Sequence, residues 1–164
     1  MRFVKQVRLA MLVCGMAVAG MAVMQAAPRA AHDHGHGHAH PTEGPHHGSL
    51  IDLGKEDYHA ELVHDEKADT VTIYILDGAA VKAVPIPAKQ ITLNMRAAGK
   101  PQQFTLTATR QKDDPEGSAS AFTATGKPLC QAMDAHGATG RLNVEIGGKM
   151  YVGKVGGHSH AHQH

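Results

Sequence analysis

Hydrophobic and polar residues alternate over much of the central part of the chain. Within residues 70–77, Val71, Ile73 and Ile75 share one face of an extended chain, and the residues between them are mostly polar. This period of two is typical of a half-buried strand. Similar stretches, rich in β-branched and aliphatic residues, predict further strands at residues 49–53, 58–65, 90–96, 103–110, 120–125, 141–146 and 149–155.

Turn-forming residues separate these stretches. The polar residues 66–69 divide the strands at 58–65 and 70–77, and residues 98–101 divide the next pair. Gly147 and Gly148 lie between the last two strands, and such a glycine pair favours a two-residue hairpin turn. The chain is therefore predicted to fold largely through local hairpins.

One segment departs from the alternation. Between residues 128 and 135, Leu129, Ala132 and Met133 have helical spacing, and Gly137 follows as a stop signal. We expect a short helix or 3₁₀ turn here.

Seven to eight short strands and one short helix in residues 49–155 predict an all-β domain. We favour an immunoglobulin-like two-sheet sandwich, with a closed barrel as the alternative. Pro85 and Pro87 interrupt an apolar stretch, which fits an edge strand or a connection between sheets.

The start of the chain has the composition of a secretory signal peptide, predicted at residues 1–26. Arg2, Lys5 and Arg8 precede an uncharged apolar run, and small residues follow it. The apolar run is short for a membrane span, so an uncleaved anchor is the alternative and the only predicted contact with a membrane. We therefore expect a periplasmic or secreted protein.

Charge and cysteine content narrow the classes of function. The chain carries a formal charge of +1, and loss of the three basic residues of the signal would make it about −2. Neither value suggests a nucleic-acid surface, which needs a concentrated basic patch. Cys14 lies in the signal, so Cys130 would be the one cysteine left, and the domain must be stable without an internal disulfide.

Two histidine-rich segments flank the predicted domain. Residues 27–48 are rich in His, Gly, Pro and Ala without apolar periodicity, which predicts disorder, and residues 156–164 form a second tail. In both, histidines alternate with mainly small residues. The histidines are His32, His34, His36, His38 and His40 in the first, and His158, His160, His162 and His164 in the second.

Imidazole is a ligand that suits Zn²⁺, Cu²⁺ and Ni²⁺. Nine closely spaced rings on a chain free to wrap an ion predict transition-metal binding in both tails. Affinity should be modest because a disordered segment loses conformational entropy when it closes on an ion. The alternatives are a solvated tail, a pH-responsive tract or, at the C-terminal end, an expression tag.

The predicted domain adds candidate ligands of its own. His46 and His47 immediately precede the first strand, and His59 and Glu61 project from one face of the second. If those strands pair, His47 can approach His59 and Glu61 and form a metal site. The alternative is a solvated or hydrogen-bonded pair on the outer face. His64 is expected to face water at a strand end.

Catalytic motifs are lacking. We find no serine elbow, HExxH motif, phosphate loop or cysteine–histidine nucleophile pair. Cys130, Met133 and His136 recur every three residues and could bind Cu⁺, but a buried thiol and a core methionine are the more common arrangement. We therefore predict that the chain is not an enzyme.

The runs YHAELVHD at residues 58–65 and VTIYILD at 71–77 resemble a group of small secreted bacterial proteins of planctomycete type that usually carry a His-Gly-rich start. The resemblance covers residues 46–155 and implies export and a compact β domain. The group has no assigned activity, so no catalytic residue is implied. Members often have His-Gly-Gly where this chain has His47-Gly48-Ser49.

Three functions follow from these observations. The first is an exported protein that buffers, scavenges or delivers Zn²⁺, Cu²⁺ or Ni²⁺, with a metal transporter or efflux component as a partner. The second is a structural or adhesive module without a metal role. The weakest is a metal-dependent enzyme using His47, His59 and Glu61.

Overall fold

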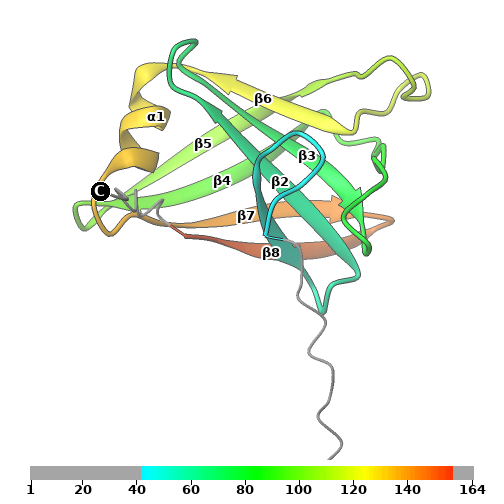
Figure 1. Cartoon of the computed structure of the whole chain (residues 1–164), viewed down its shortest axis with the longest axis horizontal. Coiled ribbons are helices and arrows are strands. Elements are labelled where there is room, and N and C mark those ends of the chain that lie inside the picture. Colours follow the sequence, from blue (N-terminus) through cyan, green and yellow to red (C-terminus); the bar gives the residue numbers. More distant parts are fainter. Residues whose placement is uncertain (1–41, 157–164) are drawn as a thin grey trace, which may run out of the picture. The chain divides into compact units, whose positions relative to one another are not determined.

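The computed structural model describes residues 42–156 (Figure 1). The predicted signal and both histidine tracts, His32 to His40 and His158 to His164, lie outside the described residues. The elements in chain order are β1 (Ser49–Leu53), β2 (Tyr58–Asp65), β3 (Thr70–Asp77), β4 (Gln90–Ala97), β5 (Lys100–Thr109), β6 (Ala121–Thr125), α1 (Lys127–Asp134), β7 (Thr139–Ile146) and β8 (Lys149–Gly156).

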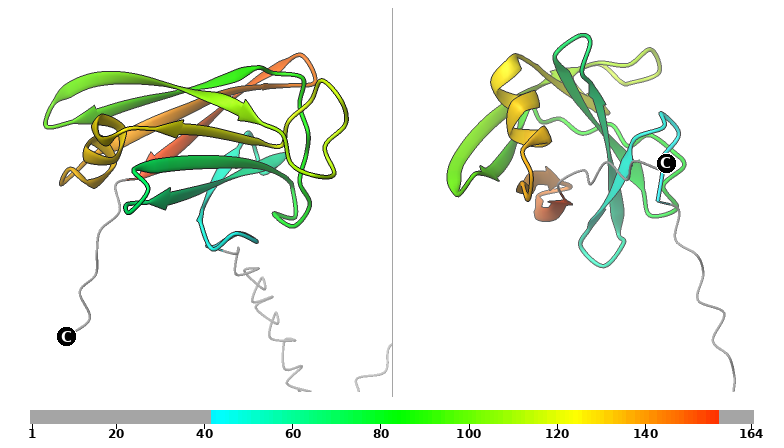
Figure 2. Two further views of the ribbon diagram at one scale, coloured as in Figure 1. Left: turned by 90° about the horizontal axis from the view of Figure 1, so that it is seen from above. Right: turned by 60° about the vertical axis from the view of Figure 1, so that its left-hand side comes forward.

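All eight strands belong to one antiparallel sheet with the order β1-β2-β3-β6-β5-β4-β7-β8. The sheet curls until its edge strands, β1 and β8, are in contact, which makes it nearly barrel-shaped (Figures 1 and 2). The all-β prediction is confirmed. The two-sheet sandwich is not confirmed, because the β3–β6, β5–β6 and β4–β7 pairings join all the strands into one continuous sheet.

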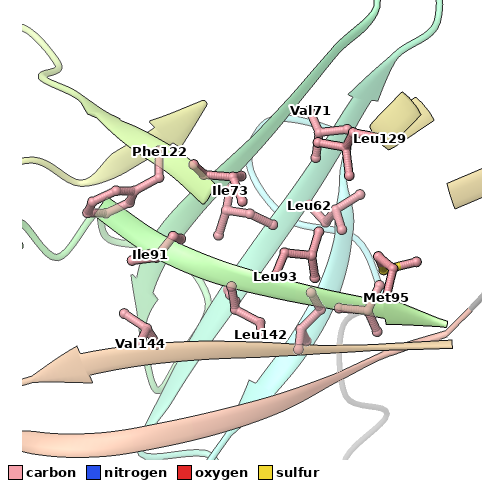
Figure 3. Packing of buried hydrophobic residues seen from close by; sticks show 14 of the residues in the cluster. Leu62, Val71, Ile73, Ile91, Leu93, Met95, Phe122, Leu129, Leu142 and Val144 are labelled. Carbon is pink, nitrogen blue, oxygen red and sulfur yellow. The ribbon is translucent and has the colours of Figure 1, made fainter. Parts of the chain in front are cut away.

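Inward-facing side chains fill the curled sheet. In β3, Val71, Ile73 and Ile75 are all fully buried, as the alternation in the sequence predicted. They pack with residues of strands distant in the sequence, such as Leu93 of β4 and Leu142 of β7 (Figure 3). Burial of apolar surface from all eight strands therefore stabilises the curvature.

Side-chain packing closes the seam between β1 and β8. A Cβ atom at Gly153 of β8 would overlap the Ile51 and Leu53 side chains of β1, so this close approach requires glycine. Beside it, Tyr151 lies edge-on to Tyr58, with ring centroids 5.4 Å apart. An ion pair of 3.1 Å between Lys149 and Asp57 lies at the same edge.

The helix α1 lies at one end of the curled sheet (Figure 1). Its predicted apolar face is confirmed, since Leu129, Ala132 and Met133 are buried. The backbone N–H of Gly126 donates to the Asp69 carbonyl oxygen at 2.7 Å, which ties the start of the helix to the β2–β3 turn. No helix in the described part of the chain is long and apolar enough to cross a membrane.

Residues 42–48 form a loop that lies over β2 and β3 (Figure 1, cyan). The Leu50 N–H donates to the Thr42 carbonyl oxygen at 3.2 Å, and Glu43 forms an isolated β-bridge with Ser49. These residues belong to the predicted disordered segment 27–48. In the structure they are packed against the domain, and the folded part begins ahead of residue 49.

Candidate metal centre

The carboxylate of Glu61 forms the hydrogen bonds that hold the N-terminal loop, residues 42–48, against the sheet. Glu61 lies on the outer face of β2 and is fully buried. Its Oε1 accepts hydrogen bonds from the backbone N–H groups of His46, at 2.6 Å, and Gly48, at 2.8 Å. Its Oε2 lies 2.7 Å from Nδ1 of His46. A buried charge is costly unless it is paired and hydrogen-bonded, and the loop meets that requirement.

Close packing holds the loop over Glu61. The His46 ring stacks on Tyr74 of β3 with centroids 3.7 Å apart and planes within 5°. A Cβ atom at Gly44 would overlap the Glu61 carboxyl group, and one at Gly48 would lie 2.5 Å from the Leu62 carbonyl oxygen. The glycines of the His-Gly-rich segment thus allow the backbone to approach the sheet.

The predicted ligand set of His47, His59 and Glu61 is not assembled in the structure. Glu61 is paired with His46, whereas the His47 ring lies 2.7 Å from Glu43 and is 88% exposed. His59 is buried, with Nδ1 3.3 Å from the Asp77 carbonyl oxygen and Nε2 3.4 Å from Asp52 Oδ1. Each of the three residues has a different partner, so neither the predicted ligand set nor the alternative, a solvated or hydrogen-bonded pair of His59 and Glu61, is observed. Both His59 and Glu61 are buried.

His64 is the histidine that the sequence prediction misplaced. It was expected to face water, but its side chain is only 9% exposed. Side chains alternate between the two faces of a strand, so His64 shares a face of β2 with Ala60 and Leu62, which are both buried in the core. Its side chain therefore enters the end of the curled sheet, next to the end of α1.

The buried imidazole of His64 has few hydrogen-bond partners. Nδ1 lies 3.5 Å from Oδ1 of Asp134, the last residue of α1. Nε2 is buried without a partner, and an unpaired buried polar atom is costly. Two carboxylates are close by, because candidate ligand atoms of His64, Glu66 and Asp134 all lie within 4.8 Å of one another.

These three residues line an open groove of about 290 Å³, together with His47, Gly48, Ser49, Leu62 and Val63. The groove exists because β1 begins at Ser49, opposite Leu62, so the last residues of β2 have no β1 neighbour. Glu66 and Asp134 are exposed and can rotate inward. One nitrogen and two carboxylate oxygens at these separations fit a divalent transition metal such as Zn²⁺ after about 1 Å of movement.

Sequence reasoning missed this group because its members come from three elements. His64 is the last residue but one of β2, Glu66 lies in the β2–β3 turn, and Asp134 ends α1. A signal for His64 was available in the strand pattern, since it stands two residues after the core-facing Leu62. Nothing local in the sequence links it to Asp134.

The Cu⁺ site predicted at Cys130, Met133 and His136 is not assembled in the structure. Cys130 and Met133 are buried in the hydrophobic cluster, whereas His136 is exposed. Burial raises the pKa of the Cys130 thiol, and the charges of Asp69 and Asp134 raise it further. The core arrangement is therefore the one that the structure supports for Cys130 and Met133.

Comparison with protein-family models, with curated proteins and with solved structures finds no match for this chain.

Proposed function

We propose that this chain is an exported protein that binds transition-metal ions in order to buffer, scavenge or deliver them. The His64–Glu66–Asp134 group is the centre of the proposal, and the histidine-rich tails would supply additional sites of lower affinity. Zn²⁺, Cu²⁺ and Ni²⁺ are the ions that suit imidazole ligands. The proposed location is the periplasm or the exterior, and the proposed partner is a metal transporter or efflux component.

The observation that carries the proposal is the grouping of His64, Glu66 and Asp134, whose candidate ligand atoms lie within 4.8 Å of one another. Nδ1 of His64 lies 3.5 Å from Oδ1 of Asp134, and the side chain that carries it is 9% exposed. In this groove the neighbouring groups are carboxylates, which attract a cation. A bound ion would take a ring nitrogen as a ligand and would neutralise the two acidic side chains.

The geometry supports binding rather than catalysis. Two of the residues predicted for a metal-dependent enzyme are not accessible. Glu61 is enclosed by the loop, and His59 is buried with its ring against the Asp77 carbonyl oxygen. An exchangeable site in an open groove suits an ion that is passed on. We therefore retain metal handling as the function and do not propose a reaction.

Calorimetric titration of the full chain with Zn²⁺, Cu²⁺ and Ni²⁺ tests the proposal. Three proteins are compared: the unchanged chain, a tail-silenced chain whose nine tail histidines are replaced by serine, and the tail-silenced chain carrying His64→Ala. The nine are His32, His34, His36, His38, His40, His158, His160, His162 and His164. We expect several ions for the first protein, one for the second and none for the third.

Two results would contradict the proposal in different ways. If the unchanged chain binds no ion, metal handling is excluded and a structural or adhesive role becomes the better account. If the tail-silenced chain binds none while the unchanged chain does, the tails alone hold metal and the His64 group is not a site. His136→Ala, an exposed histidine outside the groove, serves as the control for His64→Ala.

A further inference from the structure

We infer that His47 is the fourth ligand of the ion proposed at His64, Glu66 and Asp134, and that it exchanges Glu43 for that ion when the ion binds. This inference rests on the proposed function, because it assumes an ion in the groove. In this inference the N-terminal loop supplies the ligand that completes the site.

The first support is position. His47 lines the groove together with His64, Glu66 and Asp134. Its side chain is 88% exposed and is held by one contact, 2.7 Å from Nδ1 to Oε1 of Glu43. Glu43 is itself 59% exposed, and an exposed ion pair of this kind contributes little. Movement of the His47 ring away from Glu43 therefore costs little free energy.

The second support is the backbone of the loop. The N–H groups on either side of His47, those of His46 and Gly48, both donate to the same buried oxygen of Glu61. His47 itself has a φ of +62°, in the left-handed region that glycine adopts most readily and that asparagine, aspartate and histidine adopt more often than other residues. Glu61 thus fixes the backbone of the loop on both sides of His47, which lines the groove.

Four other non-glycine residues in the described part of the chain also have a positive φ, namely Glu56, Asp69, Ala80 and Ala98. The conformation alone therefore assigns no role to the His47 imidazole. It does provide a test, because a glycine at residue 47 would adopt the same backbone without strain.

The third support is coordination chemistry. The three ligands of the groove leave one position of a tetrahedral Zn²⁺ site open. A second imidazole gives two nitrogen and two oxygen ligands and improves the match to Zn²⁺, Cu²⁺ and Ni²⁺ over the harder Mg²⁺ and Ca²⁺. Glu61 would act as a positioning residue, since its carboxylate orients the loop and does not touch the ion.

Zn²⁺ titration of the tail-silenced full chain and of its His47→Gly and His47→Asn variants tests the inference. Both variants tolerate the left-handed backbone and remove the imidazole. We expect each to weaken Zn²⁺ binding by at least about tenfold. We also expect His47→Gly to melt at the same temperature or higher without metal, because its strain is relieved. His136→Asn should leave Zn²⁺ affinity unchanged.

The possible outcomes separate this inference from the proposed function. Weakened binding with unchanged or raised melting temperature supports His47 as a ligand. Zn²⁺ affinity within twofold of the parent in both variants overturns it and leaves the three-residue site intact. A parent chain that binds no Zn²⁺ overturns both the inference and the folded site, and the parent titration alone reports that result.

Discussion

Oε2 of Glu61 lies 2.7 Å from Nδ1 of His46, fifteen residues earlier in the chain, and the carboxylate is fully buried beneath the loop that carries the histidine. Oε1 of the same carboxylate accepts two backbone N–H groups of that loop. The loop and the carboxylate thus depend on each other: the loop supplies hydrogen-bond donors to the buried oxygens, and these hydrogen bonds order the loop.

Replacing Glu61 should therefore release residues 42–48. We expect Glu61→Ala to lower the free energy of unfolding by about 3 kcal/mol, because it leaves two N–H groups without an acceptor and opens a cavity. Glu61→Gln should cost clearly less, since one amide oxygen can still accept both N–H groups. Urea unfolding measures the difference, and Glu145→Ala, at an exposed position of β7, is the matched control.

Equal losses for Glu61→Ala and Glu61→Gln would contradict this account and would assign the stabilisation to the charge alone. Amide hydrogen exchange gives a second measurement. The N–H groups of His46 and Gly48 should exchange much faster in Glu61→Ala, while those in β4 and β7 keep their protection.

The two glycines of β8 provide a test of the contact between the edge strands β1 and β8. A methyl group at Gly153 would overlap Ile51 and Leu53, whereas one at Gly156 would meet no atom within 4 Å. We expect Gly153→Ala to destabilise the protein by about 1–3 kcal/mol through overpacking, and Gly156→Ala to change stability little. Thermal melting of both variants checks this, and equal melting temperatures would mean that the edges of the sheet are not in tight contact.

Most of the strands could be predicted from the sequence because alternation is a local property. The residues 70–77 and 58–65 were assigned within their observed bounds, and the helix at α1 was placed within one residue at each end. The pairing between strands is a different matter. Val71 lies beside Ala124 in the β3–β6 ladder, and neither local pattern contains information about the other, so the single curled sheet could not be distinguished from a sandwich.

The candidate site shows the same limit. His47, His59 and Glu61 were selected because pairing of the first two strands would bring them together. Those strands do pair, but Glu61 contacts His46, and His47 and His59 have other partners. His64 and Asp134 are separated by seventy residues and meet only because α1 lies at the end of the curled sheet where β2 finishes. The alternation of inward and outward side chains along β2 could have indicated that His64 is buried, but it could not have indicated which carboxylates lie near it.

Cys130 should be inert in the folded protein. Its thiol is buried, and burial together with nearby carboxylates raises its pKa above the ordinary value of 9.0, so little reactive thiolate exists at neutral pH. In a Cys14→Ser chain, where Cys130 is the one remaining thiol, we expect a disulfide reagent at pH 8 to react at least about 100-fold more slowly than in the urea-unfolded chain. Rapid reaction without denaturant would contradict the burial of Cys130.

Asp114 gives a prediction for acid. Burial would by itself raise the pKa of this carboxyl, but hydrogen bonds from the backbone N–H groups of Gln111 and Ser120, together with Ser120's side chain and the charge of Arg110, hold the pKa below its ordinary value of 3.8. Both N–H groups donate to Oδ2, at 2.7 and 2.8 Å. A group whose pKa is lowered by folding stabilises the protein above its unfolded pKa, and this contribution disappears as the pH falls through the folded pKa.

Asp114→Asn tests the sign of that dependence. An amide oxygen can still accept both N–H groups, but it cannot carry the charge, so we expect a loss of about 1 kcal/mol at pH 7. The difference from the unchanged protein should shrink as the pH falls below 3.8, because the aspartate then becomes neutral as well. Asp113→Asn, at the exposed neighbouring residue, is the control. A difference between Asp114→Asn and the unchanged protein that stays constant from pH 7 to pH 2 would show that the charge of Asp114 does not stabilise the loop between β5 and β6.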